Sequence, residues 1–105
     1  MTVQEIFDSG KYIRFCSEEE MNDFIGRYGK QYFWGTLSVS ETKNAFWYTR
    51  MKQNFGQVFV EYNGDNTITG HWGNVSYERR IKNSVDYATI YRDIDLASWE
   101  ELMVC

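Results

Sequence analysis

In this chain of 105 residues, 18% of the side chains are aromatic and none is proline, which excludes a disordered tail and leaves no mark of a stiff linker. A single domain over residues 1–105 is therefore expected, because a chain of this size can bury one core. The net charge is −4, and no apolar run approaches the roughly 20 residues that a membrane span needs, so we expect a cytoplasmic protein with no membrane contact.

The first three predicted elements are a helix, a strand and a second helix. Thr2 and Glu5 have the spacing of a capping box, so a short helix is predicted to begin there and to stop at Gly10. Apolar and polar residues alternate over 11–16, which predicts a half-buried strand. Residues 17–29 begin with a second capping box and repeat apolar residues at helical spacing, which predicts an amphipathic helix.

The middle of the chain predicts strands. Gln31–Val39 and Ala45–Met51 are rich in aromatic side chains and are separated by a polar stretch, so we expect two neighbouring strands of an antiparallel sheet. Gln57–Tyr62 alternates, residues 63–66 tolerate a positive φ, and Thr67–Trp72 alternates again. That order predicts a hairpin.

The last third of the chain predicts one more strand and a turn of helix. A polar, basic connection near residues 78–83 leads to the predicted strand Ser84–Arg92, and the spacing of Ser98 and Glu101 predicts a final helical turn. The predicted fold class is α+β. We expect an antiparallel twisted sheet of four to six strands, with two N-terminal helices packed on one face and a short C-terminal helical turn.

The sequence contains no recognisable catalytic or metal-binding motif. The lone histidine, His71, falls in a hairpin strand, where a structural role outweighs that of a ligand or base. Cys16 and Cys105 fit neither a disulfide framework nor a zinc motif, so both are interpreted as free thiols in a reducing cytoplasm. Asp93 and Asp95 share a strand face, but acids at a strand end are more often a solvated edge. We therefore expect no enzyme activity, no metal and no cofactor.

Charge and aromatic side chains favour a binding role. Residues 1–23 and 83–105 hold eleven carboxylates against three basic residues, whereas residues 24–82 hold eight basic residues against four acidic ones. If the two ends meet in the fold, one face carries a negative field. The consecutive rings of residues 46–48 would occupy both faces of a strand. The candidate partner-binding residues are Glu18, Glu19, Glu20, Asp23, Trp47, Tyr48, Asp93, Asp95, Glu100 and Glu101.

Two segments resemble small proteins encoded by bacteriophages and other mobile elements. Lys11–Ile25 runs from a short strand through Ser17-Glu18-Glu19-Glu20 into an amphipathic helix, and Ile90–Met103 ends on Ser98-Trp99-Glu100-Glu101-Leu102-Met103. The resemblance implies a small acidic inhibitor of a host nuclease or defence complex, of the kind represented by anti-CRISPR proteins and DNA mimics. The protein would then act in the cytoplasm of the host bacterium.

Three functional hypotheses follow. The leading one is a non-enzymatic inhibitor that occupies a nucleic-acid-handling or defence protein, because carboxylates compete for basic clefts that normally take phosphates, and aromatic rings supply anchors. The second, the alternative to the leading one, is a sheet that binds single-stranded nucleic acid, although the negative net charge disfavours direct binding. Its predicted contacts are Trp47, Tyr48, Arg50, Arg79 and Arg80. The third is a small-ligand or metal-dependent enzyme, which needs a pocket that joins His71 or the carboxylates.

Overall fold

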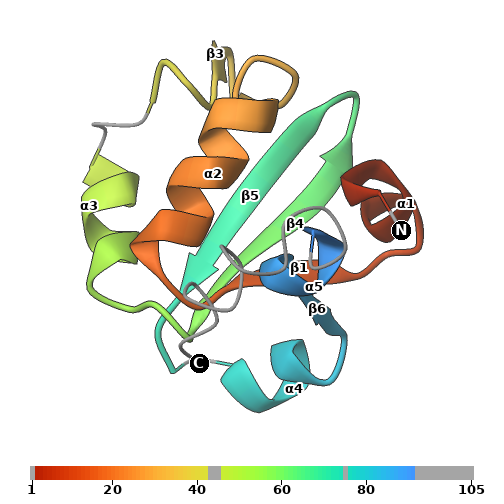
Figure 1. The fold of residues 1–105 in the computed structure, drawn as a ribbon, viewed down its shortest axis with the longest axis vertical. Coiled ribbons are helices and arrows are strands. Elements are labelled where there is room, and N and C mark those ends of the chain that lie inside the picture. The colour runs from red at the N-terminus through yellow and green to blue at the C-terminus, as the bar shows by residue number, and fades with distance from the viewer. Residues whose placement is uncertain (1, 43–45, 75, 92–105) are drawn as a thin grey trace.

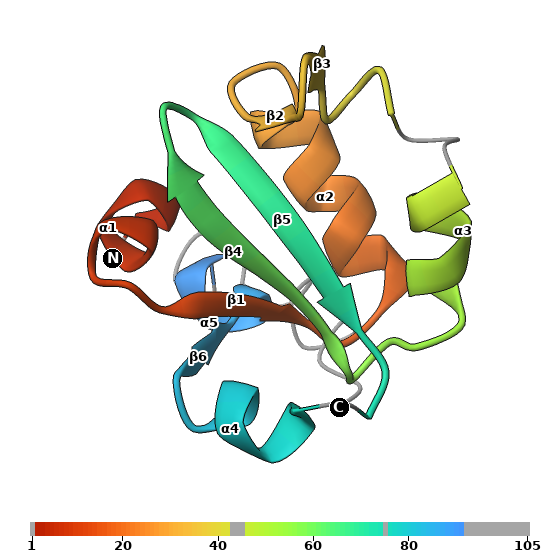
Figure 2. The same ribbon diagram turned by 180° about the vertical axis from the view of Figure 1, so that it is seen from behind.

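The computed structural model describes residues 2–42, 46–74 and 76–91, and within them the chain forms one six-stranded sheet with five helices (Figure 1). The strand order is β3-β2-β5-β4-β1-β6. The helices α1, α2, α3 and α5 pack on one side of this sheet, and α4 lies near its lower end (Figure 2). The α+β prediction is confirmed. None of the helices in the described ranges is long and apolar enough to cross a membrane.

The three N-terminal elements form where their capping residues predict them. Helix α1 (Val3–Asp8) begins at Thr2, whose Oγ1 accepts the backbone N–H of Glu5 at 3.1 Å, while the Glu5 carboxylate accepts the N–H of Thr2 at 3.2 Å. Strand β1 (Tyr12–Phe15) alternates half-buried and buried side chains. Helix α2 (Glu18–Tyr28) begins at Ser17, whose side chain accepts the N–H of Glu20.

The predicted hairpin is also confirmed. Strand β4 (Val58–Gly64) and strand β5 (Thr67–Trp72) pair antiparallel around a turn in which Asp65 and Asn66 have φ of 52° and 62°. Asp and Asn tolerate this left-handed region better than most residues, which explains why the chain reverses here. A register shift between Tyr62 and Gly64 leaves one extra residue on β4, a bulge beside the turn.

The predicted strand Gln31–Val39 is divided into two short strands. Gly35 has a φ of +72°, and the chain turns there between β2 (Phe33–Trp34) and β3 (Leu37–Ser38), which pair antiparallel. Strand β2 pairs with β5 in parallel, and β1 pairs in parallel with β6 (Ser84–Asp86). The sheet is therefore mixed, whereas the sequence predicted a purely antiparallel one.

One predicted strand is wrong and another is right only over its first three residues. Ala45–Met51 was expected as a strand, but its described part belongs to helix α3 (Phe46–Lys52), which buries Tyr48 and Met51 on one face. Ser84–Arg92 gives β6 followed by helix α5 (Tyr87–Tyr91), and the expected connection before it contains helix α4 (Tyr77–Ile81). The helical turn predicted from Ser98 lies outside the described residues.

One apolar core fills the space between the sheet and the helices α1, α2, α3 and α5. The two predicted N-terminal helices do pack on this face, and α3 and α5 join them. Trp34 packs against Gly70 of β5, where any side chain would collide with the indole ring. Cys16 is disulfide-bonded, so the free thiol predicted there is wrong and the cytoplasmic prediction loses one of its arguments. The strand and helix residues that share the core are Val3, Ile6, Phe7, Ile13, Phe15, Met21, Phe24, Ile25, Tyr48, Met51, Val58, Val60, Ile68, Tyr87 and Ala88.

Candidate partner-binding surface

The opposite face of the sheet carries polar and aromatic side chains. In Figure 2, β1, β4 and β5 face the viewer with no described helix in front of them. Because side chains alternate along a strand, the residues between the core positions point to this side. We call their set the open sheet face: Tyr12, Arg14, Phe59, Glu61, Thr69, His71 and Asp86.

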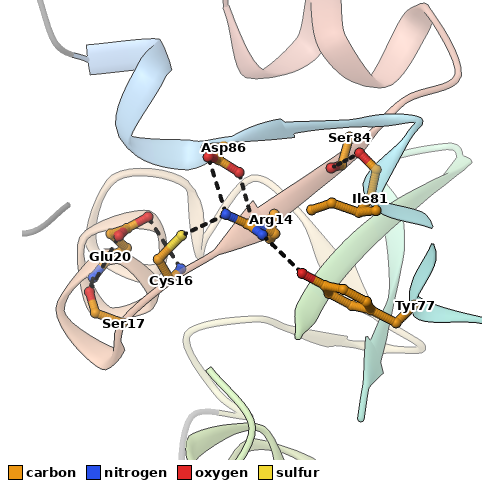
Figure 3. A network of polar contacts seen from close by, with 8 residues as sticks. All are labelled: Arg14, Cys16, Ser17, Glu20, Tyr77, Ile81, Ser84 and Asp86. Atoms are coloured by element: carbon orange, nitrogen blue, oxygen red, sulfur yellow. Dashed lines mark hydrogen bonds and ion pairs between the residues drawn. The ribbon is translucent and has the colours of Figure 1, made fainter. Parts of the chain in front are cut away.

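Strand register brings four of these side chains into one row across the sheet. Asp86 pairs with Arg14, Arg14 with Phe59, and Phe59 with His71. Arg14 binds Asp86 through Nε at 2.8 Å, and its Nη1 donates to the hydroxyl of Tyr77 on α4 at 3.3 Å (Figure 3). The Arg14 side chain is only 14% exposed, so this ion pair is stronger than one in open water. Arg14 thereby connects β1 to β6 and α4.

Phe59 is fully buried although it lies on the open sheet face and outside the main core. The rings of Tyr12 and Tyr77 pack against it at centroid distances of 6.2 and 5.9 Å. Tyr12 also meets His71 edge to face at 5.8 Å, and Nε2 of His71 lies 3.0 Å from Oε1 of Glu61. The face is therefore amphipathic, with one buried ring beneath half-buried aromatic and charged groups.

Helix α4 adds positive charge beside this face. Arg79 and Lys82 are exposed, Arg80 is half-buried, and Glu78 is the helix's acidic residue. A surface hollow of about 880 Å³ borders α4, lined in the described part by Asn74, Ser76, Tyr77, Glu78, Arg79 and Lys82. A second hollow of about 230 Å³ borders the end of β5, lined there by Gly70, His71, Trp72 and Arg80. Both hollows are open to solvent.

Glu20 is the buried acid of the described chain, with no exposed surface. Its carboxylate accepts from the backbone N–H of Cys16 and the hydroxyl of Ser17, each at 3.5 Å, and it also receives a backbone hydrogen bond from Ala88. Burial raises the pKa of Glu20 to about 7, and the nearby charge of Asp86 adds to the increase. A carboxylate in this position cannot contact a partner, so Glu20 does not belong to the predicted acidic surface.

The other predicted acids of α2 remain at the surface, but most are paired. Glu18 binds Lys52 of α3 at 3.1 Å, and Glu19 is exposed. Asp23 binds Arg27 at 2.9 Å and accepts the hydroxyl of Tyr87 at 2.6 Å. The negative field of this helix is therefore partly cancelled by its own neighbours.

The predicted aromatic anchors do not form a described binding surface. Tyr48 is 5% exposed and donates its hydroxyl to Asn22 at 2.7 Å, so it is a core residue. The side chain of Trp47 lies outside the described part of the structure. Arg50 lies on α3 with Tyr48, whereas Arg79 and Arg80 lie on α4, a separate element of the fold (Figures 1 and 2). The acids Asp93, Asp95, Glu100 and Glu101 also lie outside the described residues.

Sequence reasoning missed the residues that form the open sheet face. Their signal is present, since Tyr12 and Arg14 alternate with the buried Ile13 and Phe15. The sequence alone does not show the path of the later helices, and that path decides which face of the sheet they cover. His71 was expected to be a half-buried strand residue, and it is one.

Within residues 2–42, 46–74 and 76–91, no group of three or more His, Cys, Asp or Glu side chains could hold a metal ion. The polar groups of this surface instead bind one another across strands. Comparison with known proteins adds no family to this picture: no family model, no curated protein and no solved structure matches the chain.

Proposed function

We propose that this chain is a non-enzymatic binding protein that occupies another protein. The role that fits its sequence best is that of a phage or mobile-element inhibitor of a host nucleic-acid-handling or defence protein. The open sheet face and α4 supply the contact surface, and the partner presents acidic groups to α4. One observation carries this proposal: the open sheet face holds large half-buried side chains, and of the described helices α4 alone contacts it, through Tyr77.

The residue types of this surface support a protein partner. Tyr, Trp and Arg dominate the energetically important positions of protein interfaces, and Tyr12, Tyr77, Trp72 and Arg80 lie on or beside this face. Arg79 on α4 and Lys82 at its C-terminal cap are exposed basic residues, and Glu78 is the acidic residue of the helix. Such a local excess of positive charge favours association with acidic groups.

Two features favour a protein over single-stranded nucleic acid. The chain carries a net charge of −4, and phosphate contacts dominate affinity for nucleic acids. The rings of Tyr12 and Tyr77 pack on Phe59, so part of each half-buried ring is covered within the protein and part is left for a partner. Bases need free ring faces on which to stack.

A second candidate surface is the first turn of α2. The Glu19 side chain is exposed there, and the Glu18 side chain is 41% exposed. These carboxylates would enter a basic cleft of a nucleic-acid-handling protein and compete with phosphate groups. This version keeps the same class of function and changes only the surface that performs it.

Charge reversal separates the two surfaces. The immobilised chain and its variants would be exposed to a bacterial host lysate, and retained proteins would be quantified by mass spectrometry. The double variant Arg79→Glu, Lys82→Glu tests α4, and Glu18→Lys, Glu19→Lys tests α2. Lys30→Glu, at an exposed position after α2, is the control. Circular dichroism would verify that each variant folds.

We expect the α4 variant to reduce retention of a specific protein at least about tenfold, which corresponds to a loss of about 1.4 kcal/mol, while the control leaves it unchanged. The retained protein would then be purified and its binding measured directly. Loss with the α2 variant alone would support the acidic surface instead. Equal retention by all variants would contradict both surfaces.

A further inference from the structure

The buried carboxylate of Glu20 joins three elements of the fold. It is fully buried at the first turn of α2, accepts the N–H of Cys16 after β1, and receives a backbone hydrogen bond from Ala88 of α5. The carboxylate therefore lies where these three elements meet. A change of its charge therefore acts on all three elements at once.

Within residues 2–42, 46–74 and 76–91, few charged groups face Glu20. Asp86 of β6 is the acid whose charge acts on it, and burial together with this charge raises the pKa of Glu20 to about 7. From α2, Glu18 and Glu19 precede Glu20 in the same turn but lie at the surface, and Asp23 is engaged by Arg27 and Tyr87. Tyr87 is the titratable side chain of α5 in the described core.

Arg14 contacts both Cys16 and Asp86, the two residues that link it to Glu20. Figure 3 shows a line of contacts from Glu20 past Cys16 to Arg14 and on to Tyr77, with Asp86 beside Arg14. Nη2 of Arg14 lies 3.6 Å from Sγ of Cys16, and its Nε binds Asp86 at 2.8 Å. The bond from Nη1 to Tyr77 is longer, at 3.3 Å. A second bond to Asp86, from Nη2 to Oδ2, measures 3.4 Å. Both bonds to Asp86 join opposite charges, whereas the Tyr77 hydroxyl is neutral, so the Tyr77 bond is the first to yield when Arg14 moves.

We propose that the protonation of Glu20 is transmitted through Asp86 and Arg14 to Tyr77, and so regulates the position of α4. When Glu20 loses its proton to solvent, its charge and that of Asp86 together attract the guanidinium of Arg14 away from the Tyr77 hydroxyl. The α4 surface is then held less firmly to the sheet. The regulatory meaning of this coupling rests on the proposed function, because α4 belongs to the proposed contact surface.

Nuclear magnetic resonance of the full chain tests the coupling without any partner. The Nε–H signal of Arg14 and the amide of Tyr77 would be followed from pH 5.5 to 8.5. We expect both to titrate with a midpoint near pH 7 in the wild type and in Glu19→Gln, and to lose this transition in Glu20→Gln. Histidines in general change charge in this pH range, so His71→Gln serves as a control. Both signals should keep their transition in this variant.

A second variant distinguishes transmission from a purely local effect. In Asp86→Asn the amide of Cys16 should still titrate with Glu20, whereas the Arg14 and Tyr77 signals should not. Titration confined to Cys16 and Ala88 in the wild type, or an Arg14 transition that survives in Glu20→Gln, would overturn the proposal. Partner retention that depends on α4 but not on pH would support the proposed function and count against this regulation. A clear titration without any retained partner would do the reverse.

Discussion

Replacing Glu20 by Gln should change the dependence of stability on pH. The carboxyl has a pKa of about 7 in the folded chain against an ordinary value of 4.5. The folded state therefore binds this proton more tightly than the unfolded state. Stability is complete below pH 4.5, falls as pH rises toward 7, and stays low above it. At about 1.4 kcal/mol per pH unit, the full loss is about 3 kcal/mol.

Gln remains uncharged and keeps the size of the side chain, so Glu20→Gln should not lose this stability. Urea unfolding at pH 5, 6, 7 and 8 would measure the difference, which we expect to grow by roughly 2–3 kcal/mol in favour of the variant between pH 5 and pH 8. Glu19→Gln, exposed on the same turn, is the matched control and should run parallel to the wild type. Parallel curves for Glu20→Gln as well would refute the reasoning.

Three further substitutions test the packing. Gly70→Ala places a methyl group against the Trp34 ring and should destabilise the fold by about 1–3 kcal/mol in urea unfolding, whereas Gly26→Ala, with nothing within 4 Å, should be neutral or stabilising. Equal effects at both glycines would contradict the close contact. Phe59→Ala should cost about 3 kcal/mol in thermal unfolding, because the ring is fully buried outside the main core. A change below about 0.5 kcal/mol would show that the open sheet face does not seal it. Thr2→Ala should cost about 1 kcal/mol and Thr2→Ser much less, and identical losses would rule out the capping box.

Elements that depend on local chemistry were predictable from the sequence. The hydroxyls of Thr2 and Ser17 bind backbone amides within three residues, so their capping patterns identify helix starts without knowledge of the rest of the chain. The turn at Asp65 and Asn66 is equally local. The hairpin and the two N-terminal helices were predicted for this reason.

Elements that depend on tertiary burial were not. Aromatic residues favour strands, yet Tyr48 and Met51 are spaced for one helix face, and the core decides between the two readings. On α5, Tyr87 and Ala88 are likewise part of the core. These contacts come from distant parts of the chain, so composition alone misassigned both segments.

The candidate surface was the least predictable part. A run of three glutamates at a helix start is normally solvated, whereas Glu20 is buried and bonded by the backbone of Cys16 and, from the distant helix α5, of Ala88. Arg14 was counted simply as a charge, because its bonds to Asp86 and Tyr77 join residues 72 and 63 positions apart. No short-range pattern contains such a partner.

The position of β1 in the sheet has a consequence for synthesis of the chain. Ile13 pairs with Val60 on one side and with Val85 on the other, so this early strand waits for two much later segments. On a ribosome, the N-terminal helices can form soon after they emerge, but the sheet cannot close until residue 86 has left the exit tunnel. Nascent chains that stop before β6 would expose one unpaired side of β1, which makes them targets for chaperones or for pairing with another copy.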